Sequence, residues 1–402
     1  MRAVVFTLGC KVNEAESASI MAALEALGWE TDDKLSYADA YILNTCAVTR
    51  EAEKKSRQLI ARVKKFNKDA KIFVCGCASE KDRKSFLDRG ATFVSGAKRK
   101  QEIIDAVCAH YGYKSVELPF PKQTKTRAFI KIQDGCNNFC SYCIIPYLRG
   151  REVSRPVEDI LNEINSTESC EIVLNGINIS SYDGGLETLI CALKGVDKRI
   201  RLGSLECSAI TDKLLTALKQ LKDFAPQFHL SLQSGSTAVL KAMNRHYTRD
   251  EYLQRCAKIY EYFPDAAITT DIIAGFATET DKDFEESLSI IEEAGFARIH
   301  AFAYSPREGT VAYKLKDVPP DVKSERLHAL LQAASACSEK YISRFLGTER
   351  EIIAEEVEDG YTTGYTDNYI RVYIKGNLTA GQKFRVKLIN HFKDGALAVN
   401  ER

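Results

Sequence analysis

Along residues 1 to about 346, short apolar runs of strand character alternate with longer stretches of helical character. This alternation constrains the fold more than any other feature of the sequence. Strands that read as continuous apolar runs are buried on both faces, and crossover helices join them. The sequence therefore predicts an α/β fold built on parallel strands, whose carboxyl ends are the usual place for functional side chains.

The first part of the chain reads as a parallel α/β domain at residues 1–118. Its expected strands are 3–6, 40–43 and 71–74, and its expected helices are 14–27 and 50–66. Pro119 and Pro121, followed by the basic run 122–127, indicate a linker that ends this domain.

The middle of the chain, residues 125–346, repeats the strand-and-helix rhythm. The six expected strands are 128–132, 171–174, 200–202, 227–232, 267–273 and 298–302. Six such units predict a partial (βα)6 barrel rather than a flat sheet, with its chemistry at the carboxyl ends of the strands.

Residues 347–402 alternate apolar with polar residues between glycine turns, which is typical of a small antiparallel β-barrel. Its outward faces are expected to carry, in part, Arg371, Tyr373, Lys383, Arg385 and Lys387. Basic groups interleaved with aromatic rings suit RNA, through phosphate contacts and base stacking. The acidic run 355–359 weakens a purely electrostatic case for RNA binding by this domain.

Three closely spaced cysteines, Cys136, Cys140 and Cys143, follow the first of the six middle strands. A four-iron cluster normally takes four thiolates, so three on one loop predict a cluster with one open iron that a small molecule can complete. Phe139 and Tyr142 would supply apolar shielding for such a cluster. A structural zinc site is the alternative, although the loop has neither a second C-x-x-C pair nor a nearby His to close it.

Three further cysteines, Cys10, Cys46 and Cys77, each come just after an expected strand of the first domain. Because the carboxyl ends of parallel strands meet at one edge of a sheet, the three thiols can converge on one site. They stand beside Gly, Asn or Thr in turn-like segments, which favours a second cluster over the common burial of cysteine as a small hydrophobe. Cys75 is expected to end its strand and Cys77 to be the ligand.

Composition bears on the environment in which these thiols work. The net charge is +1, and the thirteen cysteines are an odd number. The sequence shows neither a signal peptide nor an apolar stretch long enough to cross a membrane. We therefore expect a cytoplasmic protein, in which thiols stay reduced and serve metal or redox chemistry rather than a disulfide framework.

Basic residues concentrate in two stretches, 50–68 and 370–393; the first is dominated by Lys and Arg, and the second contains no acidic residue. Together they could form a surface that faces phosphates. Taken alone, a solvated helix face for the first stretch and an ordinary polar strand face for the second explain them better.

Nearly the whole chain resembles the radical S-adenosylmethionine methylthiotransferases. The resemblance rests on the two cysteine trios and on segments 174–178, 205–206, 230–236, 243–245, 270–276 and 304–310. It implies that family's amino-terminal domain, its radical S-adenosylmethionine domain and a carboxy-terminal TRAM domain. Ala277-Thr278 stands where the family usually has Pro-Gly, and Ser79-Glu80 where Ala-Gln is common, but neither departure removes a ligand.

The resemblance implies two [4Fe-4S] clusters and S-adenosylmethionine as cofactors. The trio of Cys136, Cys140 and Cys143 would hold the radical-generating cluster, and that of Cys10, Cys46 and Cys77 the cluster that presents sulfur. Strand-end residues are expected to bind S-adenosylmethionine, namely Gly176, Asn178, Glu206, Gln233, Ser234 and Asp271. An electron donor such as flavodoxin or ferredoxin and a sulfur donor are the implied protein partners.

Within the family, segments 8–14 and 44–49 look most like the MtaB branch. That branch methylthiolates C2 of N6-threonylcarbamoyladenosine at position 37, in the anticodon stem-loop of tRNA. The MiaB branch, acting on isopentenyladenosine of tRNA, is the nearest alternative, and the RimO branch, acting on an aspartate of a ribosomal protein, is the third. A non-catalytic, zinc-stabilised RNA-binding protein is the alternative from a different class.

Overall fold

The computed structural model describes residues 1–121, 123 and 126–400. Residues 122, 124 and 125 of the expected linker and the last two residues of the chain lie outside this description. The chain divides into two compact units. Unit 1 comprises Met1–Gln123, Phe129–Thr167 and Ser305–Tyr313, and unit 2 comprises Thr124–Ala128, Glu168–Tyr304 and Lys314–Arg402. The division into domains at 1–118, 125–346 and 347–402 follows the sequence motifs and stays a prediction.

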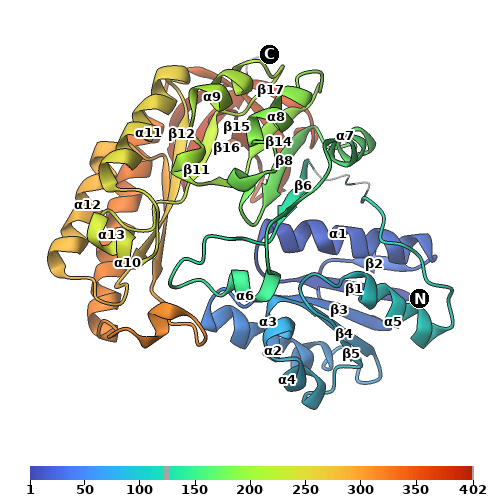
Figure 1. Cartoon of the computed structure of the whole chain (residues 1–402). Coiled ribbons are helices and arrows are strands. Elements are labelled where there is room, and N and C mark those ends of the chain that lie inside the picture. The colour runs from blue at the N-terminus through green and yellow to red at the C-terminus, as the bar shows by residue number, and fades with distance from the viewer. Residues whose placement is uncertain (122, 124–125, 401–402) are drawn as a thin grey trace. The chain divides into compact units, whose positions relative to one another are not determined.

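Unit 1 contains the parallel sheet expected near the amino terminus, with strand order β2-β1-β3-β4-β5 (Figure 1). Its strands are β1 (Arg2–Thr7), β2 (Glu30–Asp32), β3 (Ala40–Thr45), β4 (Lys71–Gly76) and β5 (Phe93–Val94). Thr7 lies opposite Asn44, and Thr45 lies opposite Gly76. The three central strands β1, β3 and β4 therefore end at the same edge of the sheet.

Helices cover both faces of this sheet (Figure 1). They are α1 (Lys11–Ala26), α2 (Arg50–Val63), α3 (Cys77–Lys81), α4 (Arg83–Asp88) and α5 (Gln101–Tyr111). One core joins strand residues such as Val5 to Ile20 of α1 and Ile104 of α5, and the other joins Val74 to Ile60 of α2 and Phe86 of α4. Because neighbouring strand residues point to opposite faces, the apolar runs seen in the sequence fill both cores.

Unit 1 also holds the segment that carries Cys136, Cys140 and Cys143. It contains β6 (Arg127–Asp134), whose first two residues belong to unit 2, α6 (Ile145–Arg149), β7 (Val153–Ser154) and α7 (Val157–Ser166). β6 and β7 pair antiparallel, with Gln133 opposite Ser154, so the cysteine loop and α6 form the connection between two paired strands.

Unit 2 contains the other strands of the expected partial barrel, which form a curled parallel arrangement. Its strands are β8 (Glu171–Gly176), β9 (Arg199–Leu202), β10 (Ser204–Leu205), β11 (Gln227–Leu230), β12 (Ala267–Ala274) and β13 (Arg298–Ala303). β8 pairs with β9, and the order β10-β11-β12-β13 forms the rest. The helices are α8 (Leu186–Ala192), α9 (Asp212–Lys219), α10 (Thr237–Ala242), α11 (Arg249–Tyr262), α12 (Asp281–Ala294) and α13 (Pro320–Ser343).

The carboxy-terminal strands close into a barrel in the order β14-β15-β16-β18-β17. They are β14 (Glu349–Glu358), β15 (Tyr361–Thr366), β16 (Arg371–Lys375), β17 (Lys383–Phe392) and β18 (Gly395–Asn400). The barrel is confirmed, but it is mixed rather than wholly antiparallel, because β16 and β18 run parallel. β17 pairs with β14 and β18, so the barrel can close only if β18 lies beside β16 in the same direction.

Within the described part of the chain, no helix combines the length and apolarity needed to cross a membrane.

Candidate functional site

The structure brings together the trio of Cys10, Cys46 and Cys77. Each thiol follows the end of one of the adjacent strands β1, β3 and β4. A Cβ placed on Gly9 would lie 3.0 Å from Cys46 Cβ and 3.1 Å from its Sγ, so the loop that carries Cys10 packs directly against Cys46. As expected, Cys75 lies inside β4 and Cys77 follows it as the first residue of α3.

Buried polar side chains fix the loops that carry this trio. Asn13 Nδ2 donates to the carbonyls of Leu8 and Thr45, at 2.8 and 3.2 Å. Asn44 Nδ2 donates to the carbonyl of Asn13 at 3.0 Å, and Thr45 Oγ1 donates to the carbonyl of Cys75 at 2.6 Å. These bonds tie the ends of all three strands to one another, so the thiols are held by the sheet edge rather than by independent loops.

The trio occupies a partly buried, low-dielectric environment. Cys10 is exposed and is the N-cap residue of α1, whereas Cys46 and Cys77 are buried. Burial raises the pKa of Cys46 to about 11, and the neighbouring thiols of Cys77 and Cys10 add to this effect. Burial likewise raises the pKa of Cys77, an effect that Arg149 opposes. The positive end of the α1 dipole favours a thiolate or an anionic cluster at Cys10.

A buried guanidinium, that of Arg149 at the end of α6, lies against this trio. Arg149 is 1% exposed and donates from Nε to Cys77 Sγ at 3.4 Å and from Nη2 to Asn13 Oδ1 at 2.7 Å. Its Nη1 lies 3.0 Å from Oε1 of Glu16 and 3.0 Å from Oδ1 of Asp134. Sequence reasoning missed this residue, because nothing local distinguishes Arg149 from the exposed arginine two positions later.

Two lysines complete the buried charge network. Glu16 also pairs with Lys100 at 3.3 Å and with Lys131 at 3.1 Å. Burial alone would raise the pKa of Glu16, but the three cations Lys100, Lys131 and Arg149 hold it well below its ordinary value. Glu16 is therefore a carboxylate at any physiological pH.

The other trio, Cys136, Cys140 and Cys143, lies on a loop with tightly constrained backbone. Cys136 N donates to the carbonyl of Gly150 at 3.1 Å, and Cys143 N donates to the carbonyl of Cys140 at 2.9 Å. A Cβ on Gly135 would lie 2.0 Å from the carbonyl oxygen of Arg151, so only glycine allows this approach of the loop's two ends. The backbone amide of Asn138 points at Cys136 Sγ, 3.5 Å away.

Aromatic rings lie beside this loop. Phe139 has a positive φ of 47°, which is unusual for a residue with a side chain and points to a functional constraint. Its ring meets that of Tyr147 edge-on with centroids 5.6 Å apart, and the Arg151 guanidinium lies 4.9 Å from its centroid. Tyr147 of α6 is 54% exposed and Tyr142 is half-buried, so the shielding of a cluster by Phe139 and Tyr142 stays a prediction.

Unit 2 places the expected S-adenosylmethionine residues at the carboxyl ends of its strands. Gly176 ends β8, and Asn178 follows it with its Nδ2 donating to Ser181 Oγ at 2.9 Å. Glu206 follows β10 and pairs with Arg245 at 3.2 Å. These three residues belong to strand ends of the same curled arrangement.

The remaining expected residues follow β11 and lie within β12. Gln233 has a φ of 72°, and its backbone amide donates to the carbonyl of Asp271 at 2.8 Å. Asp271 Oδ2 lies 3.2 Å from His229 Nε2. Ser234 is fully buried, and its hydroxyl lies 3.3 Å from the hydroxyl of Ser287 on α12, so it is engaged in packing against that helix.

Sequence reasoning did not single out Asn175, the residue before Gly176 in β8. Asn175 is 3% exposed, and neither its Oδ1 nor its Nδ2 has a hydrogen-bond partner among the described residues. A buried amide without partners costs about 1–3 kcal/mol per unsatisfied group. This orphaned amide at a strand end fits a site where a polar ligand completes the hydrogen bonding.

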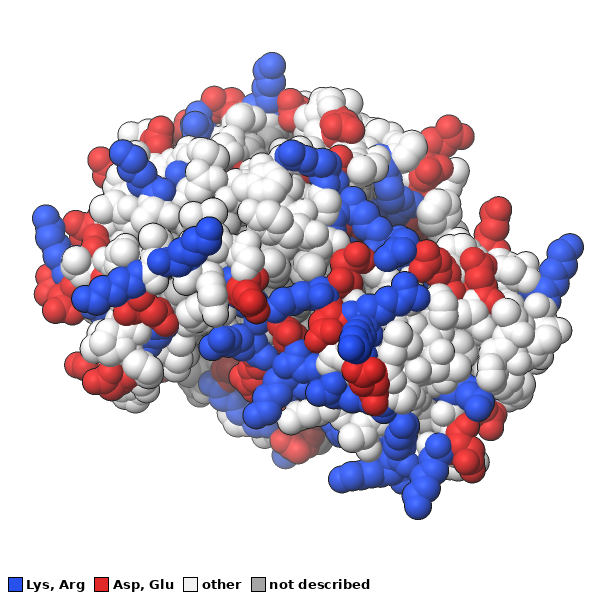
Figure 2. All heavy atoms as spheres, turned by 60° about the horizontal axis from the view of Figure 1, so that its bottom comes forward, with Lys and Arg blue, Asp and Glu red and all other residues white. Residues whose placement is uncertain are grey.

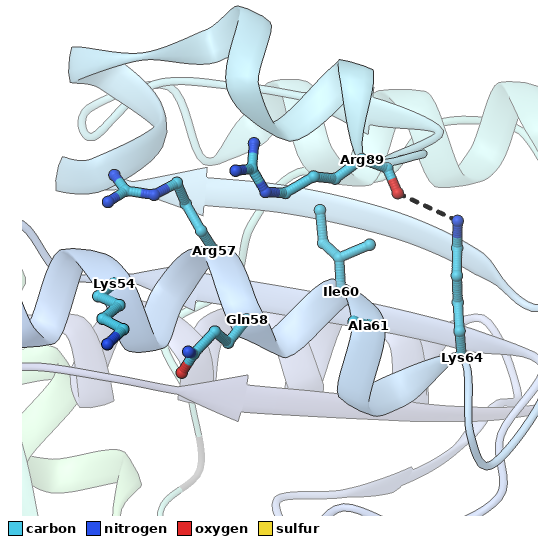
Figure 3. A pocket seen from close by; sticks show the side chains of 7 residues that line it. All are labelled: Lys54, Arg57, Gln58, Ile60, Ala61, Lys64 and Arg89. Atoms are coloured by element: carbon cyan, nitrogen blue, oxygen red, sulfur yellow. Dashed lines mark hydrogen bonds between the residues drawn. The ribbon is translucent and has the colours of Figure 1, made fainter.

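A basic groove lies between α2 and α4 of unit 1 (Figure 3). Its volume is about 430 Å³, and its lining residues are Lys54, Arg57, Gln58, Ile60, Ala61, Lys64 and Arg89. A second hollow of about 390 Å³ shares Lys54 and Arg57 and adds Lys81 and Arg307. Figure 2, in which the bottom of Figure 1 comes forward, shows Lys and Arg side chains crowded over this part of the surface.

The expected basic face of the barrel is only partly present. Tyr373 lies on the face of β16 opposite Val372 and Ile374, which pack in the barrel core, so it points outward as expected; it is nevertheless 1% exposed, because Tyr361 and Phe392 cover its ring. Arg371 pairs with Glu358 at 2.7 Å, and Lys383 pairs with acidic side chains of the same unit. Carboxylates distant in the sequence thus neutralise much of this basic stretch.

Among the described residues, no three His, Cys, Asp or Glu side chains gather closely enough around one point to hold a single metal ion. A four-iron cluster places different demands on its ligands, because each thiolate binds a different iron. The chemistry of the two donor sets, three thiols each with hydrogen-bond donors nearby, fits clusters of this kind.

Comparison with known proteins agrees with this geometry. Residues 2–96 match the model described as uncharacterized protein family UPF0004, and residues 130–291 match the radical SAM superfamily. The threonylcarbamoyladenosine tRNA methylthiotransferase MtaB of Chlamydia pneumoniae is 40% identical over 91% of this chain and 89% of its own length. That of Bacillus subtilis is 36% identical over 97% of this chain and 94% of its own length.

The chain belongs to the radical S-adenosylmethionine methylthiotransferase family. A second group of relatives lies almost as near. The tRNA-2-methylthio-N(6)-dimethylallyladenosine synthase of Fervidobacterium nodosum is 38% identical over 88% of each chain. The family's radical chemistry depends on a [4Fe-4S] cluster and S-adenosylmethionine, and members with this amino-terminal domain carry a second cluster.

Solved structures show the same fold at low sequence identity. The radical S-adenosylmethionine methyltransferase TsrM from Kitasatospora setae has a TM-score of 0.57 at 11% identity, over 85% of this chain and 89% of TsrM. The cobalamin-dependent radical enzyme OxsB has a TM-score of 0.52 at 12% identity, over 85% of this chain and 56% of OxsB. These likenesses concern the architecture alone.

Proposed function

We propose that this chain methylthiolates C2 of N6-threonylcarbamoyladenosine at position 37 of tRNA, giving 2-methylthio-N6-threonylcarbamoyladenosine. The observation that carries the proposal is the presence of two separate cysteine trios within one compact unit, one on the β6–α6 connection and one on the edge of the parallel sheet. The choice of base rests on the relatives named for threonylcarbamoyladenosine, which match at 40% and 36% identity.

Dimethylallyladenosine of tRNA, which is the isopentenyladenosine expected for the MiaB branch, is the second candidate substrate. A relative named for that product matches at 38% identity over a similar length. The reaction type is the same for both bases, so the two candidates differ only in the group carried on N6 of the adenine.

The target carbon of the adenine has neither an acidic proton nor a leaving group, so acid–base catalysis by side chains cannot activate it. When bound, the clusters and S-adenosylmethionine supply the radical chemistry and the sulfur. Cys136, Cys140 and Cys143 would hold the first cluster and leave one iron for the cofactor. Phe139 and Tyr142 would help to shield it from water.

Cys10, Cys46 and Cys77 would hold the second cluster at the sheet edge. The bonds from Asn13, Asn44 and Thr45 keep the three strand ends in register, so these thiols are preorganised. The dipole of α1 favours the negative charge of a thiolate-bound cluster beside Cys10.

In unit 2, polar groups at the strand ends would bind S-adenosylmethionine: Gly176, Asn178, Glu206, Gln233 and Asp271, whereas the buried hydroxyl of Ser234 would support the Gln233 turn by packing against α12. Asn175 joins this set, because its buried amide has no partner among the described residues. The strained φ of Gln233 supports a binding role, since such strain persists mainly where function requires it.

The reaction also needs partners. We propose tRNA as the substrate, recognised at its anticodon stem-loop, together with a one-electron donor such as flavodoxin or ferredoxin and a sulfur donor. These partners place the protein in the cytoplasm, where its thiols stay reduced.

Nucleoside analysis tests the substrate. A strain that lacks the chain should lose 2-methylthio-N6-threonylcarbamoyladenosine from its tRNA, as measured by mass spectrometry, and should regain it when the chain is returned. Loss and recovery of the dimethylallyl nucleoside instead would establish the second candidate. Unchanged nucleosides of both kinds would contradict a tRNA substrate.

Cysteine variants test the two trios separately. Replacing Cys136 with Ala should abolish reductive cleavage of S-adenosylmethionine under anaerobic conditions. Replacing Cys10 with Ala should leave cleavage but stop methylthio transfer. Full modification of tRNA by the Cys10→Ala variant would refute the assignment of the second cluster.

A further inference from the structure

Arg149 connects the two cysteine trios through the chain itself. It ends α6, six residues after Cys143, so its backbone moves with the loop of the first trio. Its side chain points the other way, into the sheet edge, and donates to Cys77 Sγ and to Asn13 on α1. Cys10 is the N-cap residue of that same helix. The guanidinium of Arg149 therefore contacts one thiol of the second trio, Cys77, and the helix that follows another, Cys10.

Burying this guanidinium is expensive. The effective cost of removing an ion from water is several kcal/mol, even where a partner is present. The cost is offset by Glu16 and Asp134, each of which accepts from Arg149, and by the additional pairing of Glu16 with Lys100 and Lys131. Three cations and two carboxylates leave this set with one net positive charge; Arg149, Lys100 and Glu16 are buried, and Lys131 and Asp134 are partly exposed.

That surplus charge lies where the thiols are. Nε of Arg149 is the donor that meets Cys77 Sγ, and the other side of the guanidinium is occupied by the carboxylates. An arrangement that served only to neutralise Glu16 would not need this donor to reach a sulfur. Hydrogen bonds to cluster sulfurs and nearby charge both set the reduction potential of an iron–sulfur cluster.

We propose that Arg149 is a positioning residue that locks the loop of the first trio onto the second trio and raises the reduction potential of the cluster held by Cys10, Cys46 and Cys77. The proposal rests on the second cluster proposed above. Its chemical basis is the donated hydrogen bond together with the net positive charge of the buried set. Arg149 thus fixes both the relative placement of the two loops and the electron affinity of one of the sites.

The test uses the full-length chain with Cys136, Cys140 and Cys143 replaced by Ala, so that reconstitution loads only the second cluster. In this background Arg149→Gln is combined with Asp134→Asn, which removes the donor while keeping the net charge of the buried set. The midpoint potential is measured by a redox titration followed by electron paramagnetic resonance, and bound iron is counted. Arg151→Gln, which removes an exposed guanidinium two residues along, is the matched control.

We expect the double variant to shift the oxidised-to-reduced ratio at a fixed potential by about tenfold toward oxidised, which corresponds to about 59 mV for a one-electron couple. The control should leave the ratio unchanged. Loss of the cluster's iron from a variant whose thermal unfolding is unaltered would also support the positioning role. A full cluster with an unshifted potential would overturn the proposal.

A second variant covers the case in which the double variant does not fold. Arg149→Lys keeps the charge but cannot reach Cys77, Asn13 and both carboxylates at once. It should shift the potential in the same direction, and an unshifted potential would again overturn the proposal. If the parent background itself binds no iron, the proposed second cluster fails, and that result is distinguishable from the failure of Arg149.

An independent observation concerns the groove between α2 and α4. Lys54, Arg57, Lys64 and Arg89 line it, and no carboxylate is among its lining residues. In the adjoining hollow, the carboxylates of Glu53 and Glu308 are outnumbered by the basic side chains, and Glu53 accepts from Arg57, Lys81 and Arg307. The two hollows share Lys54 and Arg57 and so form one positive track along α2.

We infer that the phosphate backbone of the substrate RNA binds along this track, which deepens the proposed function by naming a surface for the RNA. Lys54 and Lys64 lie about 15 Å apart along the axis of α2, at the usual rise of about 1.5 Å per residue, which is enough to meet more than one phosphate. The net positive charge of the groove complements a polyanion, and its walls of long, flexible cations suit a phosphodiester chain.

RNA-binding measurements at several salt concentrations test this surface. Lys54→Gln with Lys64→Gln should weaken binding of the unmodified tRNA and lower the slope of log K against log salt by about 0.7–0.9 for each phosphate that the groove no longer neutralises. Lys34→Gln with Lys114→Gln, which removes two exposed lysines of unit 1 away from the groove, is the control with an equal change of charge. S-adenosylmethionine cleavage should stay unchanged in both.

An unchanged slope in the groove variant would overturn the surface while leaving the proposed function intact. No tRNA binding by the unsubstituted chain would contradict the proposed function itself. Binding of an acidic protein to the groove, weakened by the same two substitutions while tRNA binding persists, would assign the surface to another partner and also overturn the inference.

Discussion

Gly76 offers a sharp test of how the second cysteine trio is built. It ends β4 immediately before Cys77, with φ of 105° and ψ of −169°. This backbone region is essentially restricted to glycine and costs other residues about 1–3 kcal/mol. A Cβ at Gly76 would also lie 2.3 Å from the carbonyl oxygen of Thr45, an approach that forces one strand end to move.

The Gly76→Ala variant should therefore lose both stability and cluster binding. Displacing a packed neighbour adds about 1–3 kcal/mol, so the total loss is about 2–6 kcal/mol. For a unit of this size, each kcal/mol lowers the unfolding midpoint by about 2–4 °C. Because Cys46 follows Thr45 and Cys77 follows Gly76, the displaced strand ends carry two of the three thiols with them.

Thermal unfolding followed by circular dichroism, together with iron counting after anaerobic reconstitution, measures both effects. Gly112→Ala is the matched control, since Gly112 also has a positive φ of 76° but nothing lies within 4 Å of its added Cβ. The control should lose about 1–2 kcal/mol and keep all its iron, whereas Gly76→Ala should lose about half, the share of one of two four-iron clusters. Equal midpoints and equal iron contents would refute the reasoning.

Three further predictions concern other parts of the chain. Burial favours the neutral form of Glu53, but its hydrogen bonds to cationic side chains lower its pKa to about 2. The stabilising effect of the Glu53 carboxylate should therefore be present above about pH 4.5 and lost as the pH falls toward 2. In Glu53→Gln, the unfolding midpoint should depend less on pH over this range. Glu171→Gln should lower the stability of unit 2 by about 3–5 kcal/mol in denaturant unfolding, because it leaves the buried guanidinium of Arg201 without its carboxylate. Asn175→Ala should change the unfolding midpoint less than Asn44→Ala, which removes three buried hydrogen bonds, yet should weaken S-adenosylmethionine binding measured by calorimetry.

Much of the architecture follows from local patterns. Apolar runs that are buried on both faces identify parallel strands, and the three central strands of unit 1 and the middle strands of the chain all lie where their periodicity predicts. The positions of Cys10, Cys46 and Cys77 after neighbouring strands were enough to predict one shared edge, because parallel strands end together. The domain boundaries and the S-adenosylmethionine residues remain predictions.

Other features depend on which strands become neighbours. The parallel pairing of β16 with β18 follows from barrel closure rather than from the alternation within either strand. Tyr373 lies on the outward face of β16, as the alternation with Val372 and Ile374 predicts, but Tyr361 and Phe392 cover its ring and leave it 1% exposed. A period of two tells which residues share a face, whereas the neighbouring strands decide which residues of the outer face are covered.

The sequence by itself therefore determined the strands, the two thiol trios and the family, since each depends on residue types at short spacing. Only the tertiary structure decided what surrounds the thiols. Arg149 and Glu16 are 133 residues apart, yet they form a buried ion pair beside Cys77. An arginine side chain can be buried only where carboxylates from other elements pair with it. The residues next to Arg149 in the sequence do not reveal which carboxylates these are.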